Sequence, residues 1–132
     1  MHRVLNPRIH GYIDYLIVAV LALAPTLFGF GGIAAALCYI LAVAQLGMSL
    51  ITAYPLGAAK VIPFPVHGGI ELAVGILALV SPWLFRFSDV PAARNFFLVA
   101  GVSVVLVWAL TNYKAAELPS RPVHAFRRRI HT

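Results

Sequence analysis

Charge is scarce in this chain, and acidic charge is scarcest. Of its 132 residues, 11% are charged, 61% are hydrophobic and only four are Asp or Glu. Soluble domains average about 25% charged and about 45–50% apolar residues. This composition excludes an ordinary water-soluble domain and predicts a protein of the lipid bilayer, of a length that fits a single domain.

Several patterns that carry chemistry are also missing. The single cysteine, Cys38, excludes an intrachain disulfide, and its apolar surroundings predict a small packing residue. There is no phosphate-binding glycine loop, no CxxC pair and no soluble segment that could carry a Ser/His/Asp arrangement. These absences predict a protein that is not an enzyme, and they indicate no cofactor.

What the chain does contain is four long apolar runs. They cover about residues 9–29, 33–54, 66–87 and 92–113, close to the roughly 20 residues that a helix needs to cross a bilayer. Strands of a membrane barrel would alternate apolar and polar residues over about ten positions, and these runs do not. The first run is too long for a secretory signal, and its twin lies mid-chain. The expected fold class is an all-α membrane protein with four transmembrane helices.

The second half of the chain repeats the first. His10 and Asp14, with a glycine after the histidine, recur 57 positions later (67 − 10) as His67 and Glu71. At the same offset a Pro-x-Leu-Phe-x-Phe pattern recurs, and a Thr-x-Tyr pattern recurs at an offset of 59 (111 − 52). Each unit holds two spans, so both units enter the membrane from the same side, as a parallel repeat. We therefore expect two helical hairpins packed as a four-helix bundle.

Composition divides the chain into five segments. They are a basic lead at 1–8, a first two-helix repeat at 9–54, a proline-rich connector at 55–65, a second two-helix repeat at 66–113 and a basic tail at 114–132. Eight of the ten Lys and Arg residues flank the spans on the side of the lead, connector and tail, and two lie on the other side. The positive-inside rule then predicts a multi-pass protein of the cell membrane with both termini cytoplasmic.

The tripeptide Ser81, Pro82, Trp83 resembles the motif that names the SPW repeat family of small bacterial and archaeal membrane proteins. Further stretches are similar to that family: HG-x-I-D-Y, APTLFGF, VIPFPVH and SPWLFRF, so that the resemblance covers most of residues 9–113. The first unit departs from it, with APT at residues 24–26, and is expected to be a diverged copy. The resemblance implies an architecture of two-helix repeats; it supplies no activity and no catalytic residues.

Two prolines lie about one turn before the outer ends of the first and third spans. Pro25 and Pro82 each remove a helix hydrogen bond and free the carbonyl four residues earlier. In a bilayer such a carbonyl needs another donor, and Ser81 is placed to supply one. Trp83 can sit at the membrane interface. The simpler interpretation is a kink with an aromatic anchor, and the alternative is a hinge or an outer ligand vestibule.

Other polar side chains are few. Gln45 is a lone amide near the middle of the second span, and we expect it to make an interhelical hydrogen bond worth about 0.6 kcal/mol. After the last span, Arg127, Arg128 and Arg129 are expected to rest on anionic lipid headgroups at the cytoplasmic face, at roughly 1 kcal/mol per cation. No nucleic-acid-binding module accompanies these cations, so no nucleic-acid partner is expected.

The repeated histidine and acid form the strongest candidate site. Residues four apart share a helix face, so His10 can contact Asp14 and His67 can contact Glu71. An ionised acid costs about 2.5–3.5 kcal/mol at the bilayer centre and less near its edge. We therefore expect both acids to face the bundle interior, and each other across the repeat axis.

Three interpretations of this motif stay open. In the first, each histidine sits at the headgroup level, neutralises its own acid and fixes the start of its helix. In the second, repeat symmetry gathers all four side chains into one site for a divalent metal, a proton relay or a cation mouth. In the third, the two histidines ligate haem, an arrangement that the adjacent carboxylates disfavour.

The function expected from the sequence is that of a non-enzymatic membrane protein with a structural, scaffolding or regulatory role. The alternative is an oligomeric conduit or binding protein for a proton, cation or small ligand, which the shortage of polar residues in the spans disfavours. A metal- or haem-binding membrane subunit is the third. Because each histidine has its own acid one turn away, and because a helix N-terminus disfavours a cation, the sequence predicts a colourless protein without metal or haem.

Overall fold

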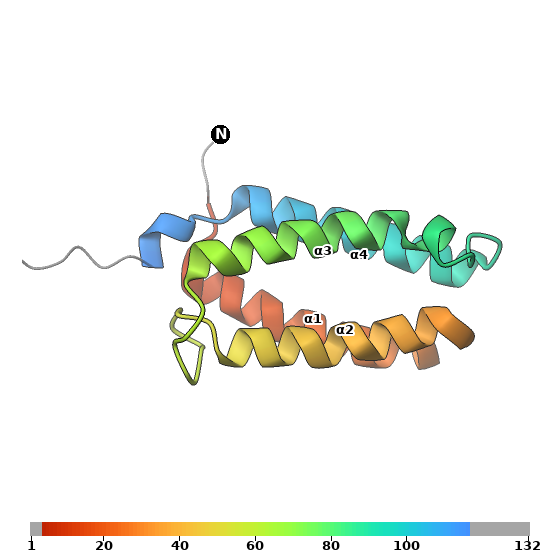
Figure 1. Ribbon diagram of the computed structural model, residues 1–132, viewed down its shortest axis with the longest axis horizontal. Helices are drawn as coiled ribbons and strands as arrows, with labels where there is room; N and C mark the ends of the chain where they lie inside the picture. Colours follow the sequence, from red (N-terminus) through yellow and green to blue (C-terminus); the bar gives the residue numbers. More distant parts are fainter. Residues whose placement is uncertain (1–3, 117–132) are drawn as a thin grey trace, which may run out of the picture.

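The computed structural model of the protein describes residues 4–116 and contains two helical hairpins. Its helices are α1 (Pro7–Phe28), α2 (Gly32–Leu50), α3 (Phe64–Leu84) and α4 (Pro91–Leu110), followed by a short 3-10 helix, η1 (Tyr113–Ala116). The α1–α2 hairpin and the α3–α4 hairpin lie one above the other (Figure 1). All four helices are long and apolar enough to cross a membrane, which confirms the predicted all-α membrane fold.

Both hairpins point the same way along the bundle. The start of α1, the segment between α2 and α3, and η1 lie at one end of the bundle, which we call the connector end (Figure 1). The tight turns within the two hairpins lie at the opposite end, which we call the turn end. This is the parallel repeat that the sequence predicted.

The helices begin slightly earlier than predicted. Helices α1 and α3 start at Pro7 and Phe64, two residues before the expected positions 9 and 66. Pro7 suits the first turn because no amide hydrogen is needed there. Asn6 caps α1 by accepting a hydrogen bond from the Ile9 amide at 2.9 Å. At the turn end α1 stops at Gly29, whose φ of 69° is left-handed and free of strain only for glycine.

The predicted ends of the second and fourth spans were wrong by a few residues. Helices α2 and α4 stop at Leu50 and Leu110, before the expected positions 54 and 113. The apolar run continues past both ends, but the backbone there leaves the helix to pair with another segment. These short pairings involve Thr52 after α2 and Thr111 after α4, and they shape the site described below.

The two helix-interior prolines occupy equivalent positions near the turn end. Pro25 lies inside α1 and Pro82 inside α3. In each case the carbonyl of the proline accepts a hydrogen bond from a phenylalanine amide five residues on, from Phe30 at 3.1 Å and from Phe87 at 2.8 Å. The equivalent bonds show that the first helices of both hairpins end in the same way.

Around Pro82 the serine does not serve the carbonyl that was expected from the sequence. The Ser81 hydroxyl donates to the Leu77 carbonyl at 2.6 Å, one residue before the Ala78 carbonyl that the proline was expected to free. Ser81 is buried, whereas 58% of Trp83 is exposed. The indole therefore projects from the bundle surface, where a membrane interface can accommodate it.

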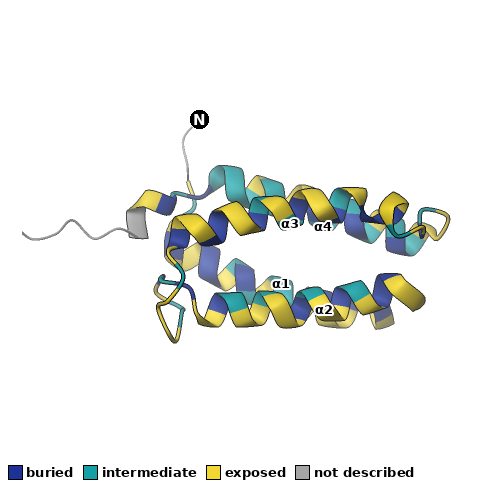
Figure 2. Cartoon of the chain, in the orientation of Figure 1, coloured by how far each residue is buried: buried dark blue, intermediate teal, exposed yellow. Residues whose placement is uncertain are grey.

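Burial separates a packed interior from a lipid-facing exterior (Figure 2). Small and aromatic side chains fill the core toward the turn end, and large apolar side chains on all four helices are exposed. Helices α3 and α4 approach closely at Gly75 and Gly101. A Cβ added to Gly101 would lie only 2.9 Å from the Gly75 carbonyl oxygen. The exposed apolar surface is the one that lipid tails would contact, as expected of a multi-pass membrane protein.

Candidate functional site

Four titratable side chains meet near the connector end of the bundle. His10 and Asp14 come from α1 and His67 and Glu71 from α3, and all four are buried, with at most 2% of their surface exposed. One potential ligand atom from each lies within 4.8 Å of the others. The structure therefore brings together the four residues of the repeated motif and turns both acids toward the interior.

The two carboxylates are shared between the hairpins. His10 Nε2 lies 3.2 Å from Asp14 Oδ1, the contact expected within α1, and 3.1 Å from Glu71 Oε2. His67 Nε2 lies 3.2 Å from Asp14 Oδ2. The prediction of two separate pairs, each within one helix, is thus wrong for α3. The ends of α1 and α3 come so close that each carboxylate contacts a histidine of the opposite hairpin.

A threonine from the opposite hairpin holds each histidine. His10 Nδ1 lies 2.8 Å from Thr111 Oγ1, and His67 Nδ1 lies 2.7 Å from Thr52 Oγ1. Each threonine hydroxyl donates its one hydrogen to the carbonyl four residues earlier, at 2.6 Å. The hydroxyl oxygen must then accept from the imidazole, so Nδ1 carries the hydrogen and Nε2 is the nitrogen that faces the carboxylates.

Short backbone pairings place these two threonines. Thr111 lies beside Leu5, and Thr52 lies beside Ile62, which is the counterpart of Leu5 at the offset of 57. The Leu5 amide donates to the Leu110 carbonyl at 2.9 Å. The segment that enters each hairpin therefore pairs with the segment that leaves the other. This exchange brings each threonine to the histidine of the opposite hairpin.

Two buried tyrosines complete the hydrogen bonds of the carboxylates. Tyr54 donates to Asp14 Oδ2 at 2.9 Å, and Tyr113 donates to Glu71 Oε2 at 3.2 Å. Burial raises the pKa of both phenol groups well above its ordinary value, and the neighbouring carboxylates add to that shift. Both hydroxyls therefore stay protonated at neutral pH and act as donors to the two carboxyl groups.

Aromatic rings cover the site toward the connector end. The buried ring of Phe64 has its centroid 5.1 Å from that of His10, 4.7 Å from that of Tyr113 and 5.4 Å from that of Tyr54. These rings keep water from the polar groups on that side. A dry environment strengthens the hydrogen bonds that are made and makes an unpaired polar group more costly.

The glycine after each histidine lets another side chain of the connector end come close. A Cβ on Gly68 would lie 2.6 Å from the ring of Tyr113, and a Cβ on Gly11 would lie 2.8 Å from the Leu56 side chain. Real Cβ atoms do not approach other atoms this closely. In both copies of the His-Gly dipeptide, a larger residue than glycine at the second position would therefore clash with a neighbouring side chain.

Sequence reasoning missed several residues of the site. The Thr-x-Tyr repeat was visible at its offset of 59, but the apolar run placed it on the ends of helices and gave it no role. The repeat itself was the signal, because a Thr-x-Tyr segment follows each hairpin. Phe64 carries no such signal, since its counterpart in the first repeat is Pro7.

Four atoms in the centre of the site lack a hydrogen-bond partner among the described residues. They are His10 Nε2, His67 Nε2, Asp14 Oδ1 and Glu71 Oε1. The nitrogen-to-oxygen distances are short enough for hydrogen bonds, but no ring N–H points along them. Two imidazoles with two carboxylates are a donor set that divalent transition metals accept. Haem does not fit, because carboxylate oxygens 3.1–3.2 Å from both Nε2 atoms occupy the space of a porphyrin ring.

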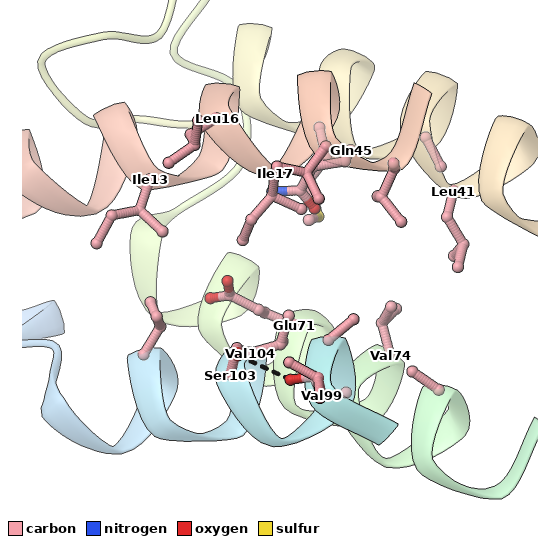
Figure 3. A pocket seen from close by; sticks show the side chains of 18 of the residues that line it. Ile13, Leu16, Ile17, Leu41, Gln45, Glu71, Val74, Val99, Ser103 and Val104 are labelled. Carbon is pink, nitrogen blue, oxygen red and sulfur yellow. Dashed lines mark hydrogen bonds between the residues drawn. The ribbon is translucent and has the colours of Figure 1, made fainter. Parts of the chain in front are cut away.

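An apolar cavity of about 410 Å³ lies between the hairpins in the middle of the bundle (Figure 3). All four helices line it, and its polar lining consists of Gln45, Glu71 and Ser103. The Ser103 hydroxyl is already bonded to the Val99 carbonyl at 2.7 Å. Glu71 belongs both to the cavity wall and to the four-residue site, so the two features adjoin.

Two further polar contacts were predicted, one at Gln45 and one at the basic tail. The Gln45 amide nitrogen is buried without a hydrogen-bond partner in the described part of the chain, so the expected interhelical bond is not formed. Gln45 borders the apolar cavity, and no acceptor on the neighbouring helices lies within hydrogen-bond distance of its amide nitrogen. The basic residues Arg127, Arg128 and Arg129 lie outside the described residues.

Comparison with known proteins identifies the family. Neither a search of curated proteins nor a search of solved structures gave a significant match. The family model of the SPW repeat domain matches residues 8–112, which include both hairpins and all four residues of the buried centre. This agrees with the resemblance seen at Ser81, Pro82 and Trp83. Because the match extends over most of the chain, this small multi-pass membrane protein belongs to the SPW repeat domain family.

Proposed function

We propose that the protein is a non-enzymatic scaffold of the cell membrane, in which a buried polar centre fastens two hairpins into one rigid unit. The observation that carries this proposal is the exchange of partners between hairpins. His10 bonds Thr111 at 2.8 Å and His67 bonds Thr52 at 2.7 Å. Each histidine thus makes its Nδ1 hydrogen bond only when both hairpins are packed together.

The bilayer strengthens these polar interactions between the hairpins. Separating the hairpins would leave two carboxylates and two imidazoles facing hydrocarbon, where no water replaces the lost partners. Removing one member of a buried ion pair costs about 3–5 kcal/mol in soluble proteins. The polar centre therefore favours a closed bundle far more than the apolar contacts between the hairpins alone, since lipid tails can replace apolar contacts.

Two features support a role without catalysis or conduction. Phe64 and two tyrosines cover the titratable centre toward the connector end. The cavity on the other side has Gln45, Glu71 and Ser103 as its polar lining, too few groups to form a continuous path for an ion. In our proposal the connector end faces the cytoplasm, where the basic segments rest on anionic headgroups.

Substitution of the two threonines tests the fastening. Thr52→Val and Thr111→Val keep the shape of the side chain but remove the acceptor of each Nδ1–H, leaving a buried donor unpaired. We expect the double variant to unfold at a clearly lower temperature than the wild type in detergent. Ser103→Ala is the matched control, because its hydroxyl bonds only the Val99 carbonyl of its own helix. If the double variant is as stable as Ser103→Ala, the centre does not hold the hairpins together.

A flux assay distinguishes the scaffold from a conduit. Proteoliposomes containing the wild type should show no proton or cation flux beyond that of empty liposomes. Asp14→Asn and Glu71→Gln variants should behave in the same way. Flux in the wild type that these two variants lose would refute the scaffold and establish a conduit.

The cavity supports a second candidate function, the binding of a small lipophilic molecule. Its volume of about 410 Å³ falls within the roughly 300–1,000 Å³ of typical ligand pockets. The unpaired Gln45 amide nitrogen borders it, so we propose an apolar molecule with one hydrogen-bond acceptor. Organic extraction of the purified protein followed by mass spectrometry should recover this molecule from the wild type and less of it from Gln45→Leu. Recovery of bulk lipid alone from both proteins would remove this candidate.

A further inference from the structure

We propose that His10, Asp14, His67 and Glu71 form a binding site for one divalent transition-metal ion of the Zn²⁺ class. The ligands would be the two Nε2 atoms and one oxygen from each carboxylate. This inference goes beyond the scaffold role, which the hydrogen bonds between the hairpins support without an ion. It also reverses the expectation from the sequence, which assumed that each histidine is satisfied by the acid in its own helix.

The threonines prepare both histidines as ligands. Thr52 and Thr111 accept the Nδ1 hydrogens, so the Nε2 lone pair of a neutral imidazole is directed into the site. Histidines that bind metals nearly always donate their other ring N–H to such a partner, which fixes the tautomer and the ring orientation. The same arrangement on both histidines is what two metal ligands require.

The directions of the Nε2 atoms favour an ion over a pair of imidazolium groups. If both rings were protonated at Nε2, each N–H would be expected to point at a carboxylate oxygen. Instead, His10 Nε2 and His67 Nε2 have no aligned partner, and neither do Asp14 Oδ1 and Glu71 Oε1. Each of the four residues thus keeps one buried atom without a partner, and each offers a ligand atom within 4.8 Å of the others, so one cation could be bound by all four residues.

The spacing of these atoms is that of ligands around one ion. In a tetrahedral site with bonds of about 2.0–2.1 Å, neighbouring ligand atoms are about 3.3 Å apart. His10 Nε2 lies 3.2 Å from Asp14 Oδ1 and 3.1 Å from Glu71 Oε2. His67 Nε2 lies 3.2 Å from the other oxygen of Asp14, and all four residues offer atoms within 4.8 Å of one another. The remaining adjustment is small enough for side-chain rotation.

Charge and donor type select the class of ion. Two carboxylates and two neutral imidazoles carry a charge of −2, so a divalent cation makes the centre neutral, as a site inside a membrane helix requires. Two imidazole nitrogens disfavour Mg²⁺ and Ca²⁺, which prefer oxygen ligands, and the lack of thiolate disfavours Cu⁺. Tyr54 and Tyr113 each donate to a carboxylate oxygen and hold these ligands in place.

Metal content of the full-length protein tests the proposal. Protein purified in detergent is stripped with a chelator, incubated with Zn²⁺ or Co²⁺, freed of excess ion by gel filtration and analysed for metal. We expect one ion per chain in the wild type, with the visible absorption of tetrahedral Co²⁺. Asp14→Asn, which preserves size but removes an anionic ligand, should lose the ion, and Thr52→Val should bind it about 10–100-fold more weakly.

Control variants exclude metal binding by other histidines and loss of metal through unfolding. A variant in which His2, His124 and His131 are all replaced by alanine should keep the ion, because none of these three histidines is among the four proposed ligands. Ser103→Ala should also keep it. If Asp14→Asn does not fold, Glu71→Gln replaces it. Wild-type protein without bound metal, binding that persists in the folded acid variant, or binding lost with the three outer histidines would each overturn the proposal. The threonine test of the scaffold is independent, so a failed metal site would leave that proposal standing.

Discussion

His10 and Thr111 lie 2.8 Å apart although 101 positions separate them in the chain. The equivalent bond of the other repeat joins His67 and Thr52 at 2.7 Å. In both cases the histidine comes from the first helix of one hairpin and the threonine follows the second helix of the other. Neither hairpin therefore completes its half of the centre alone. The consequences can be measured with substitutions that leave the helices themselves unchanged.

Loss of either buried tyrosine hydroxyl should destabilise the bundle. Tyr54→Phe and Tyr113→Phe each remove a donor to a buried carboxyl group, and the loss of a buried hydrogen-bond partner costs about 1–3 kcal/mol. We expect the larger effect at Tyr54, whose bond is 2.9 Å against 3.2 Å at Tyr113. Thermal unfolding in detergent measures the difference. Tyr39→Phe is the control, since Tyr39 is exposed; equal stability of all three variants would contradict the hydrogen bonds described here.

Gly68→Ala should displace the Tyr113 ring from the buried site. The added Cβ would meet the Tyr113 ring at 2.6 Å, so the ring must move and its bond to Glu71 must lengthen or break. We expect a lower unfolding temperature and faster hydrogen exchange near η1. Gly69→Ala is the control one residue away, where no described atom lies within 4 Å of an added Cβ. If both substitutions have the same small effect, Tyr113 does not depend on the close approach at this glycine.

Composition and the internal repeat were enough to predict the four helices and the parallel hairpins, and they indicated that Asp14 and Glu71 face the interior. The gathering of His10, Asp14, His67 and Glu71 was one of three interpretations that the sequence left open. The exchange of partners could not be predicted. A repeat offset says which residues are equivalent, but not whether Thr52 serves the histidine of its own hairpin or the other one. The helix ends were missed for a related reason, because the apolar run continues into the segment whose backbone pairs with Ile62.

The orientation in the membrane can be checked with reporter fusions. The eight-to-two distribution of Lys and Arg predicts that the connector end is cytoplasmic. Fusions after residues 31, 60, 90 and 120 should therefore report outside, inside, outside and inside in turn. The inverted series would show that charge does not set the topology of this protein. A series that does not alternate would show that one of the four helices does not span the membrane.

Replacing Gln45 by leucine should stabilise the protein purified without a ligand. The amide nitrogen is buried beside an apolar cavity and has no partner among the described residues. An unsatisfied buried polar group costs about 1–3 kcal/mol, and leucine has nearly the same size. We expect Gln45→Leu to raise the unfolding temperature, and Gln45→Glu, which adds a charge, to lower it. A lower unfolding temperature for Gln45→Leu would show that the amide has a partner, such as a bound lipid or ligand.

The two acids should differ in importance despite their equivalent positions. Asp14 lies within 3.2 Å of both histidines and accepts from Tyr54, whereas Glu71 has one such histidine contact, to His10. Asp14→Asn should therefore destabilise the bundle by about 3–5 kcal/mol, as expected when one partner of a buried charge cluster is removed. Glu71→Gln should cost less, because His67 keeps its contact with Asp14. Unfolding of the two single variants and of the double variant in detergent measures this order. Because both acids contact His10, the double variant should lose less than the sum of the single losses. A larger loss from Glu71→Gln than from Asp14→Asn would mean that Glu71, not Asp14, is the carboxylate on which both histidines depend.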